Sequence, residues 1–148
     1  MELITASAVV SYATKLEEES ARLYEEMAQK HPENKDIFLS LAKENKINKQ
    51  SIERAYYSVI SDKLEACFIK ILNTDNYSIE IKLPEKADYS TTLSKAVEIE
   101  EKIQKFLIDA SNAIGALVPD VSWTFSRIGK KREERINKLK SLLTKVKG

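Results

Sequence analysis

The chain has 148 residues, of which 24 are lysine or arginine and 23 are aspartate or glutamate, so its formal net charge is +1. This balance does not favour a nucleic-acid binder, which needs an excess of positive charge. Only three glycines and three prolines are present, which favours an all-α class built from long helices. We expect residues 1–148 to form one domain.

The single cysteine, Cys67, excludes an intramolecular disulfide and a cysteine-based zinc site. We expect it to be a small buried apolar side chain, because no histidine accompanies it that would activate it as a nucleophile. No run of about 18 apolar residues and no signal-peptide pattern is found. We therefore expect a soluble cytoplasmic protein that does not associate with a membrane.

The first predicted helix covers about residues 5–29, where apolar residues recur at helical spacing and charged residues fill the other face. A single acid, Glu17, falls on the apolar side. The pattern ends at His31 and Pro32, since a residue before proline avoids helical geometry.

A second helix is predicted over about residues 34–60. Two amides, Asn45 and Asn48, lie three residues apart on its inner face. Because the connection to the first helix is short, the two helices should form an antiparallel αα-hairpin.

Helical periodicity weakens over about residues 61–90, which we interpret as a long crossover connection. Some helical turns are still possible over Leu64–Leu72. The segment Tyr77–Leu83 alternates apolar and charged residues in an extended style. Its pattern leaves open whether it covers the bundle or pairs with another chain.

Two further helices are predicted, over about residues 91–114 and 120–146, with Gly115 and Pro119 between them. The third helix is expected to begin at a hydroxyl cap near its first residue. A lone acid, Glu100, lies on its apolar stripe. The fourth helix has two arginines, Arg132 and Arg135, at heptad positions that should face a core.

The polar residues on the inner faces repeat between the two halves of the chain. In each half, one acid on the first helix is followed by a polar pair at i and i+3 on the second. The six residues of this predicted cluster are Glu17, Asn45, Asn48, Glu100, Arg132 and Arg135.

Four segments resemble the helices of the ferritin-like superfamily, in particular its rubrerythrin-like members: KLEEESARLYEEMAQ (15–29), LAKENKINKQSI (41–52), VEIEEKIQKFL (97–107) and IGKKREERINKL (128–139). The resemblance implies a ferritin-like up-down four-helix bundle of two antiparallel hairpins. It also implies a di-metal site with one Glu from each of two helices and a Glu-x-x-His from each of the other two.

The chain departs from that ligand pattern at four of six positions. Only Glu17 and Glu100 match, while the Glu-x-x-His pairs are replaced by the two amides and the two arginines. A guanidinium has no lone pair to offer a metal and stays charged at ordinary pH. We therefore expect no cofactor and no catalytic residue, and a charge-balanced buried cluster in a protein with a structural or partner-binding role.

The alternative is an iron-dependent or other di-metal oxidoreductase or peroxidase with an atypical ligand set, of which only Glu17 and Glu100 can be named. Other interpretations remain open. The arginines could extend to solvent from the edge of the stripe, and the two glutamates could lie on a solvated face. A shifted helical register would offer instead Glu44, Glu101, Glu133 or Glu134, without bringing a histidine.

Three further expectations concern the remaining side chains. His31, the only histidine, should be an exposed loop residue. The aromatic residues Tyr24, Tyr56, Tyr57, Trp123 and Phe125 should pack in the core or at the bundle ends. Residues 127–148 contain nine basic and two acidic residues, but inward arginines would reduce the exposed excess, so nucleic acid is a disfavoured partner. An unidentified protein or a second copy remains possible.

Overall fold

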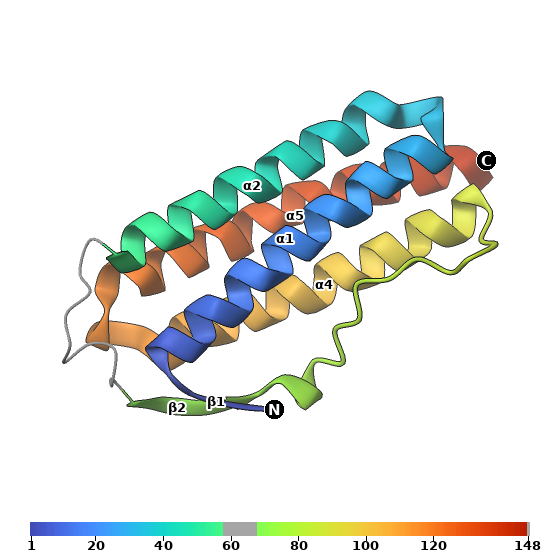
Figure 1. Cartoon of the computed structure of the whole chain (residues 1–148). Helices are drawn as coiled ribbons and strands as arrows, with labels where there is room; N and C mark the ends of the chain where they lie inside the picture. The colour runs from blue at the N-terminus through green and yellow to red at the C-terminus, as the bar shows by residue number, and fades with distance from the viewer. Residues whose placement is uncertain (58–67, 148) are drawn as a thin grey trace.

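The computed structural model describes residues 1–57 and 68–147. Within them, four long helices account for most of the chain: α1 (Ala6–Lys30), α2 (Lys35–Tyr57), α4 (Tyr89–Ile114) and α5 (Pro119–Lys147). They form two antiparallel hairpins, α1 with α2 and α4 with α5 (Figure 1). The predicted four-helix arrangement is confirmed, with most helix ends shifted by one or two residues. The predicted end of the second helix, residues 58–60, lies outside the described residues.

The helices begin and end where local chemistry satisfies their free backbone groups. The Thr5 side chain accepts a hydrogen bond from the backbone N–H of Ala8 and caps α1. Asp88 caps α4 in the same way through the N–H of Thr91, so the cap is a carboxylate and not the hydroxyl we expected. Gly115, with a positive φ of 50°, ends α4.

A two-stranded antiparallel sheet corrects the all-α prediction. Strand β1 (Glu2–Thr5) pairs with β2 (Phe68–Asn73), placing Leu3 opposite Leu72. Leu3 is buried and Leu72 is partly buried against the core. The helical turns that we allowed over residues 64–72 are therefore wrong for residues 68–72, and residues 64–67 lie outside the described residues. The β-branched residues of FIKILN suit a strand once a partner strand is available.

The crossover continues from β2 through a short 3₁₀ turn, η2 (Thr74–Asn76), and runs along α4 to the far end of the bundle (Figure 1). Tyr77 and Leu83 are buried against the bundle. The Tyr77 hydroxyl donates a hydrogen bond to the Asp109 carboxylate of α4 at 2.7 Å. Of the two alternatives for this segment, the structure supports the one in which it covers the bundle. α4 consequently runs in the same direction as α2.

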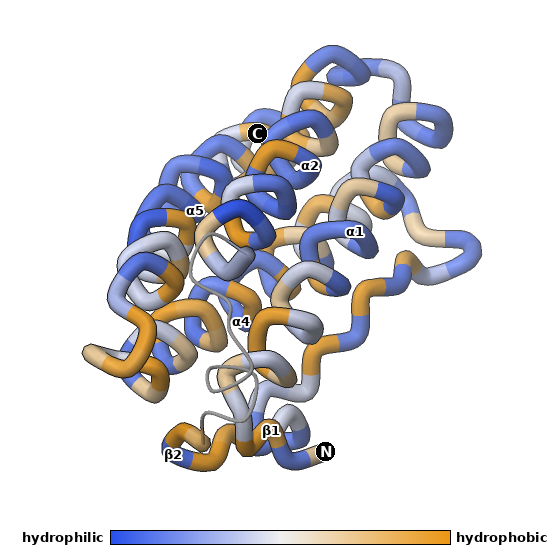
Figure 2. Tube along the Cα trace, turned by 60° about the vertical axis from the view of Figure 1, so that its left-hand side comes forward, coloured by the Kyte–Doolittle hydropathy of each residue, from blue (hydrophilic) through white to orange (hydrophobic). Residues whose placement is uncertain are grey.

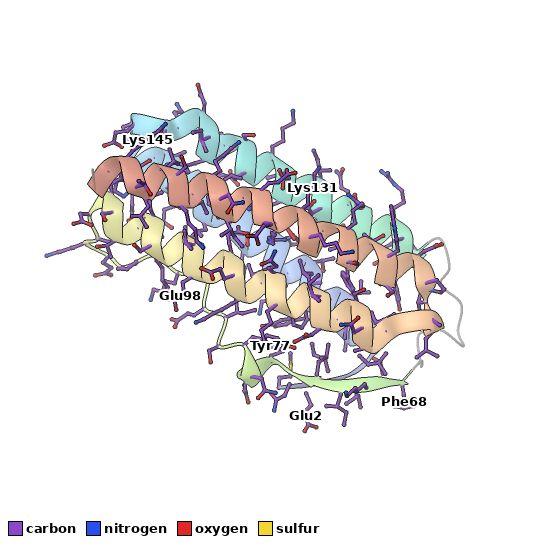
Figure 3. The ribbon with its side chains drawn as sticks, turned by 180° about the vertical axis from the view of Figure 1, so that it is seen from behind. Glu2, Phe68, Tyr77, Glu98, Lys131 and Lys145 are labelled. Atoms are coloured by element: carbon purple, nitrogen blue, oxygen red, sulfur yellow. The ribbon has the colours of Figure 1, made fainter. Side chains whose placement is uncertain are left out.

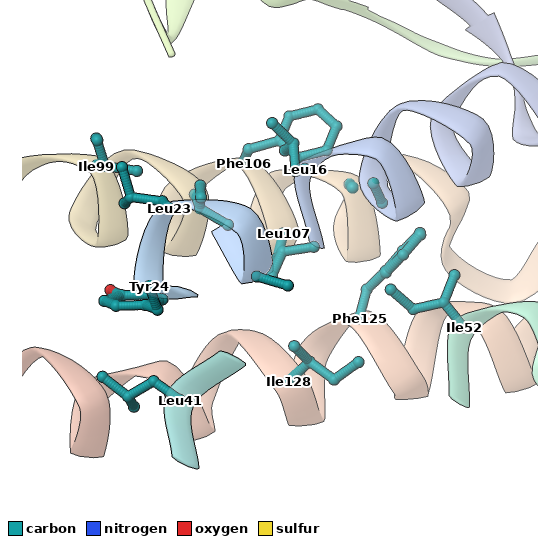
Figure 4. Packing of buried hydrophobic residues seen from close by; sticks show 14 of the residues in the cluster. Leu16, Leu23, Tyr24, Leu41, Ile52, Ile99, Phe106, Leu107, Phe125 and Ile128 are labelled. Atoms are coloured by element: carbon teal, nitrogen blue, oxygen red, sulfur yellow. The ribbon is translucent and has the colours of Figure 1, made fainter. Parts of the chain in front are cut away.

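The apolar stripes of the four helices meet in one core (Figures 2 and 4). In the close view, Leu16 of α1, Leu107 of α4 and Phe125 of α5 pack towards one another. Of the aromatic residues expected in the core, Tyr57 and Trp123 are exceptions, with exposed fractions of 62% and 66%. No helix in the described ranges is long and apolar enough to cross a membrane.

Candidate functional site

The polar centre of the bundle receives at least one side chain from each long helix. Glu17 comes from α1, Asn45 from α2, Glu100 from α4, and Arg132 and Arg135 from α5. The exposed fraction of each is 2% or less. These five residues are called the central cluster below. Their burial overturns two alternatives, since the arginines do not extend to solvent and the two glutamates do not lie on a solvated face.

Arg132 joins the two carboxylates. Its Nε donates a hydrogen bond to Glu100 Oε2 at 2.8 Å. Its Nη1 donates to Glu17 Oε1, and its Nη2 lies 3.3 Å from Glu17 Oε2. The planar guanidinium thus binds Glu17 through two of its nitrogens and Glu100 through the third. One side chain of α5 ties α1 to α4.

Arg135 connects the carboxylate of Glu100 to helix α2. Its Nη2 donates to Glu100 Oε1 and to Asn45 Oδ1, both at 2.9 Å. Its Nη1 lies 3.3 Å from the carbonyl oxygen of Leu41 and 3.4 Å from Glu44 Oε1. Its Nε is buried and makes no hydrogen bond with any residue that the structure describes.

Two further hydrogen bonds complete the central cluster. Asn45 donates through Nδ2 to Glu17 Oε2 at 2.7 Å, which closes a ring of contacts through both arginines. The hydroxyl of Tyr24 donates to Glu100 Oε1 at 2.7 Å. The ring of Tyr24 also lies under the Arg135 guanidinium, 5.2 Å from its carbon to the ring centroid.

The charges of the central cluster are matched, with two carboxylates and two guanidiniums. Burial alone would raise the pKa of Glu100, but Arg135 and Arg132 overcome this effect and hold that pKa at about 2. Burial would likewise lower the pKa of each arginine, while Glu100 and Glu17 raise both above the ordinary value. Burial followed by the charge of Glu100 raises the pKa of Tyr24 well above its usual range. At neutral pH Glu100 is therefore ionised, and its ion pairs with Arg132 and Arg135 are fully formed.

The residues present do not fit a di-metal centre. Both oxygens of Glu17 and both oxygens of Glu100 already accept hydrogen bonds from side chains of the protein. The guanidinium of Arg132 lies between the two carboxylates, and that of Arg135 is bound to Glu100. Both guanidiniums would repel a cation. Over residues 1–57 and 68–147, no three His, Cys, Asp or Glu side chains converge in a way that could hold a metal ion.

Asn48 departs from the predicted cluster. It is 7% exposed, but its side chain makes no hydrogen bond with a described residue that would connect it to the other five. Asn45 lies one turn earlier on α2 and occupies the space between Glu17 and Arg135.

Two participants were missed from sequence. Tyr24 lies seven residues after Glu17 in the same heptad row and was expected to pack in the core, but its hydrogen bond to Glu100 was not predicted. Glu44 contacts Arg135 from the edge of the bundle, with a side chain that is 35% exposed. The other residues of the shifted register, Glu101, Glu133 and Glu134, are exposed.

His31 is not the exposed loop residue that we expected. It is half-buried, and its ring stacks on Tyr89 with centroids 5.0 Å apart. Its Nε2 lies 3.3 Å from the Thr92 hydroxyl. The histidine therefore helps to join the turn between α1 and α2 to the start of α4. Cys67 lies outside the described residues.

A groove between α1 and α2 leads from the surface towards the central cluster. Its volume is about 290 Å³, and Glu17 and Asn45 are among the residues that line it. At its rim, Lys49 pairs with Glu18 at 2.6 Å and Lys46 pairs with Glu25 at 3.5 Å. These pairs neutralise the rim and leave the groove without an excess of either charge.

No protein-family model matches the chain, and no curated protein or solved structure matches it either.

Proposed function

We propose that this protein is a non-catalytic relative of the rubrerythrin-like proteins, with a ferritin-like bundle in which buried ion pairs replace a di-metal site. The observation that carries the proposal is the position of Arg132, whose guanidinium lies between Glu17 and Glu100. In the rubrerythrin-like ligand pattern, these two carboxylates correspond to the metal ligands on the two helices that contribute one Glu each. Here each has a guanidinium as its cationic partner.

The replacement preserves the charge balance that a buried carboxylate pair requires. Without a cation, two buried carboxylates would repel each other and at least one would take up a proton. The two guanidiniums supply the missing positive charge from α5 alone. The hydrogen bonds of the central cluster join all four helices. We therefore infer that the cluster holds the helices in one register.

We infer a structural or partner-binding role in place of redox chemistry. A metal-dependent oxidoreductase would have to displace Arg132 and Arg135 from both carboxylates before a cation could enter. That step would leave two uncompensated guanidiniums in the core, at a cost of several kcal/mol. The geometry therefore favours the non-catalytic role over the enzymatic alternative.

Metal analysis of the purified protein tests the proposal. After incubation with ferrous, manganous or zinc ions and gel filtration, we expect well under one equivalent of metal per chain and no peroxide turnover. A matched variant, N45E/N48H/R132E/R135H, restores the ligand types of the family pattern. It should retain up to two equivalents if the four positions correspond to ligand positions.

Two tightly held metal ions per wild-type chain, or peroxide turnover that depends on them, would overturn the proposal. Circular dichroism of the variant establishes whether it is helical. If the variant does not fold, the wild-type measurement still decides between the two functions.

A further inference from the structure

A second feature of the molecule lies on its surface, where the C-terminal half of α2 meets the first turns of α5. A hollow of about 410 Å³ is lined there by Arg54 of α2 and by Trp123 and Arg127 of α5, together with Ser51 and Asp120. None of the residues that line this hollow belongs to the central cluster.

Trp123 has the character of an interface residue. Its exposed fraction is 66%, although tryptophan has a large apolar surface to bury. The guanidinium of Arg127, one turn later on α5, lies over its ring at 5.4 Å from the ring centroid. A cation–π contact of this kind favours one arrangement of the two side chains, and side chains that are already arranged lose less entropy when they bind another molecule.

The hollow also has an excess of positive charge. Neither Arg54 nor Arg127 forms an ion pair with any residue in the described part of the chain, and Asp120 is the only acid among the lining residues. The groove between α1 and α2 differs, because Lys46 and Lys49 at its rim are paired with glutamates. Tryptophan and arginine together are the residues that dominate binding energy in protein interfaces.

We propose that this hollow docks an acidic segment of a partner protein, with an apolar side chain against Trp123 and carboxylates on Arg54 and Arg127. The proposal rests on the partner-binding form of the proposed function and supplies the chemistry of the partner. A nucleic acid fits less well, because Asp120 would face its phosphates and only two cations are available to neutralise them.

Trp123 is the only tryptophan of the chain, so its fluorescence reports on the hollow directly. The probes are a short peptide of leucine and glutamate, its counterpart with glutamine in place of glutamate, and single-stranded oligothymidylate. We expect the acidic peptide alone to shift the Trp123 emission to shorter wavelength in a saturable manner. The double variant R54E/R127E should bind it at least about tenfold more weakly.

The matched control is K138E/K140E, which changes the net charge equally at two exposed positions farther along α5. It should bind the acidic peptide like the wild type. The proposal is overturned by an acidic peptide that causes no saturable shift, by equal binding of the glutamine peptide, by preferential binding of oligothymidylate, or by equal weakening in both charge-reversal variants. None of these outcomes bears on metal content, so a protein that fails this test and binds no metal still satisfies the proposed function.

Discussion

Arg132 of α5 and Glu100 of α4 form a fully buried ion pair, with Nε and Oε2 2.8 Å apart and both side chains inaccessible to solvent. The pair does not stand alone, because the same guanidinium also holds Glu17 of α1. A buried ion pair of this kind adds little net stability when it is compared with an apolar pair of similar volume. Losing one partner is much more costly, because the remaining charge stays buried.

Replacing Arg132 with methionine should therefore destabilise the protein by about 3–5 kcal/mol. The variant would leave Glu17 and Glu100 with too little compensating charge in the core. Urea unfolding at neutral pH, followed by circular dichroism, measures the change in the free energy of unfolding. The matched control is Lys131→Met at the adjacent position, whose side chain points to solvent (Figure 3) and should change stability by less than about 0.5 kcal/mol. Equal effects at the two positions would contradict the structural importance of the ion pairs.

Replacing the whole polar centre with apolar residues should cost less than removing Arg132 alone. Once no charge remains, no desolvation penalty is left uncompensated. The combined variant is E17L/Y24F/N45L/E100L/R132M/R135M. Its unfolding free energy should lie between those of R132M and the wild type, or above both. A combined variant that is less stable than R132M would show that the hydrogen bonds themselves provide most of the stability.

We expect acidic pH to lower the free energy of unfolding through protonation of Glu100. The pKa of this carboxyl is about 2 in the folded protein and about 4.3 in an unfolded chain. The unfolded state thus binds one more proton between these values, and stability falls as the pH is lowered through that window, by about 1.4 kcal/mol per pH unit. Above about pH 5.5 this contribution is complete, because the carboxyl is then ionised in both states.

Urea unfolding at a series of pH values between about 2 and 6 measures the effect. Glu100→Gln should lose this part of the pH dependence, whereas Glu101→Gln, at an exposed neighbouring position, should retain it. An unchanged pH profile in Glu100→Gln would mean that other carboxyls cause the acid sensitivity.

Tyr24 contributes through two separable contacts, its hydroxyl with Glu100 and its ring with Arg135. Tyr24→Phe removes only the hydroxyl and should cost about 1 kcal/mol. Tyr24→Leu also removes the ring from beneath the guanidinium and should cost at least about 1 kcal/mol more. Thermal unfolding of both variants compares the two losses. Equal melting temperatures would exclude a stabilising contribution from the ring.

The positions of the central cluster were accessible from sequence, because heptad spacing places a residue on the inner or outer face of a helix. Arg132 and Arg135 could be assigned inward on that basis. Their individual partners could not be assigned, since spacing within one helix says nothing about rotation relative to another. Asn45 and Asn48 were equivalent by periodicity, and only the packing of α2 against α1 and α5 brings Asn45 alone between Glu17 and Arg135.

The two-stranded sheet shows more clearly what local sequence patterns cannot predict. β1 and β2 are separated by more than sixty residues of sequence, and neither is long enough to be recognised alone. Phe68–Asn73 is a strand because Glu2–Thr5 provides a partner and Leu3 a buried neighbour. Helical hydrogen bonds close within a few residues and so leave a periodic trace in the sequence. Strand pairing and the contacts of the central cluster join distant residues, so only the tertiary structure decides them.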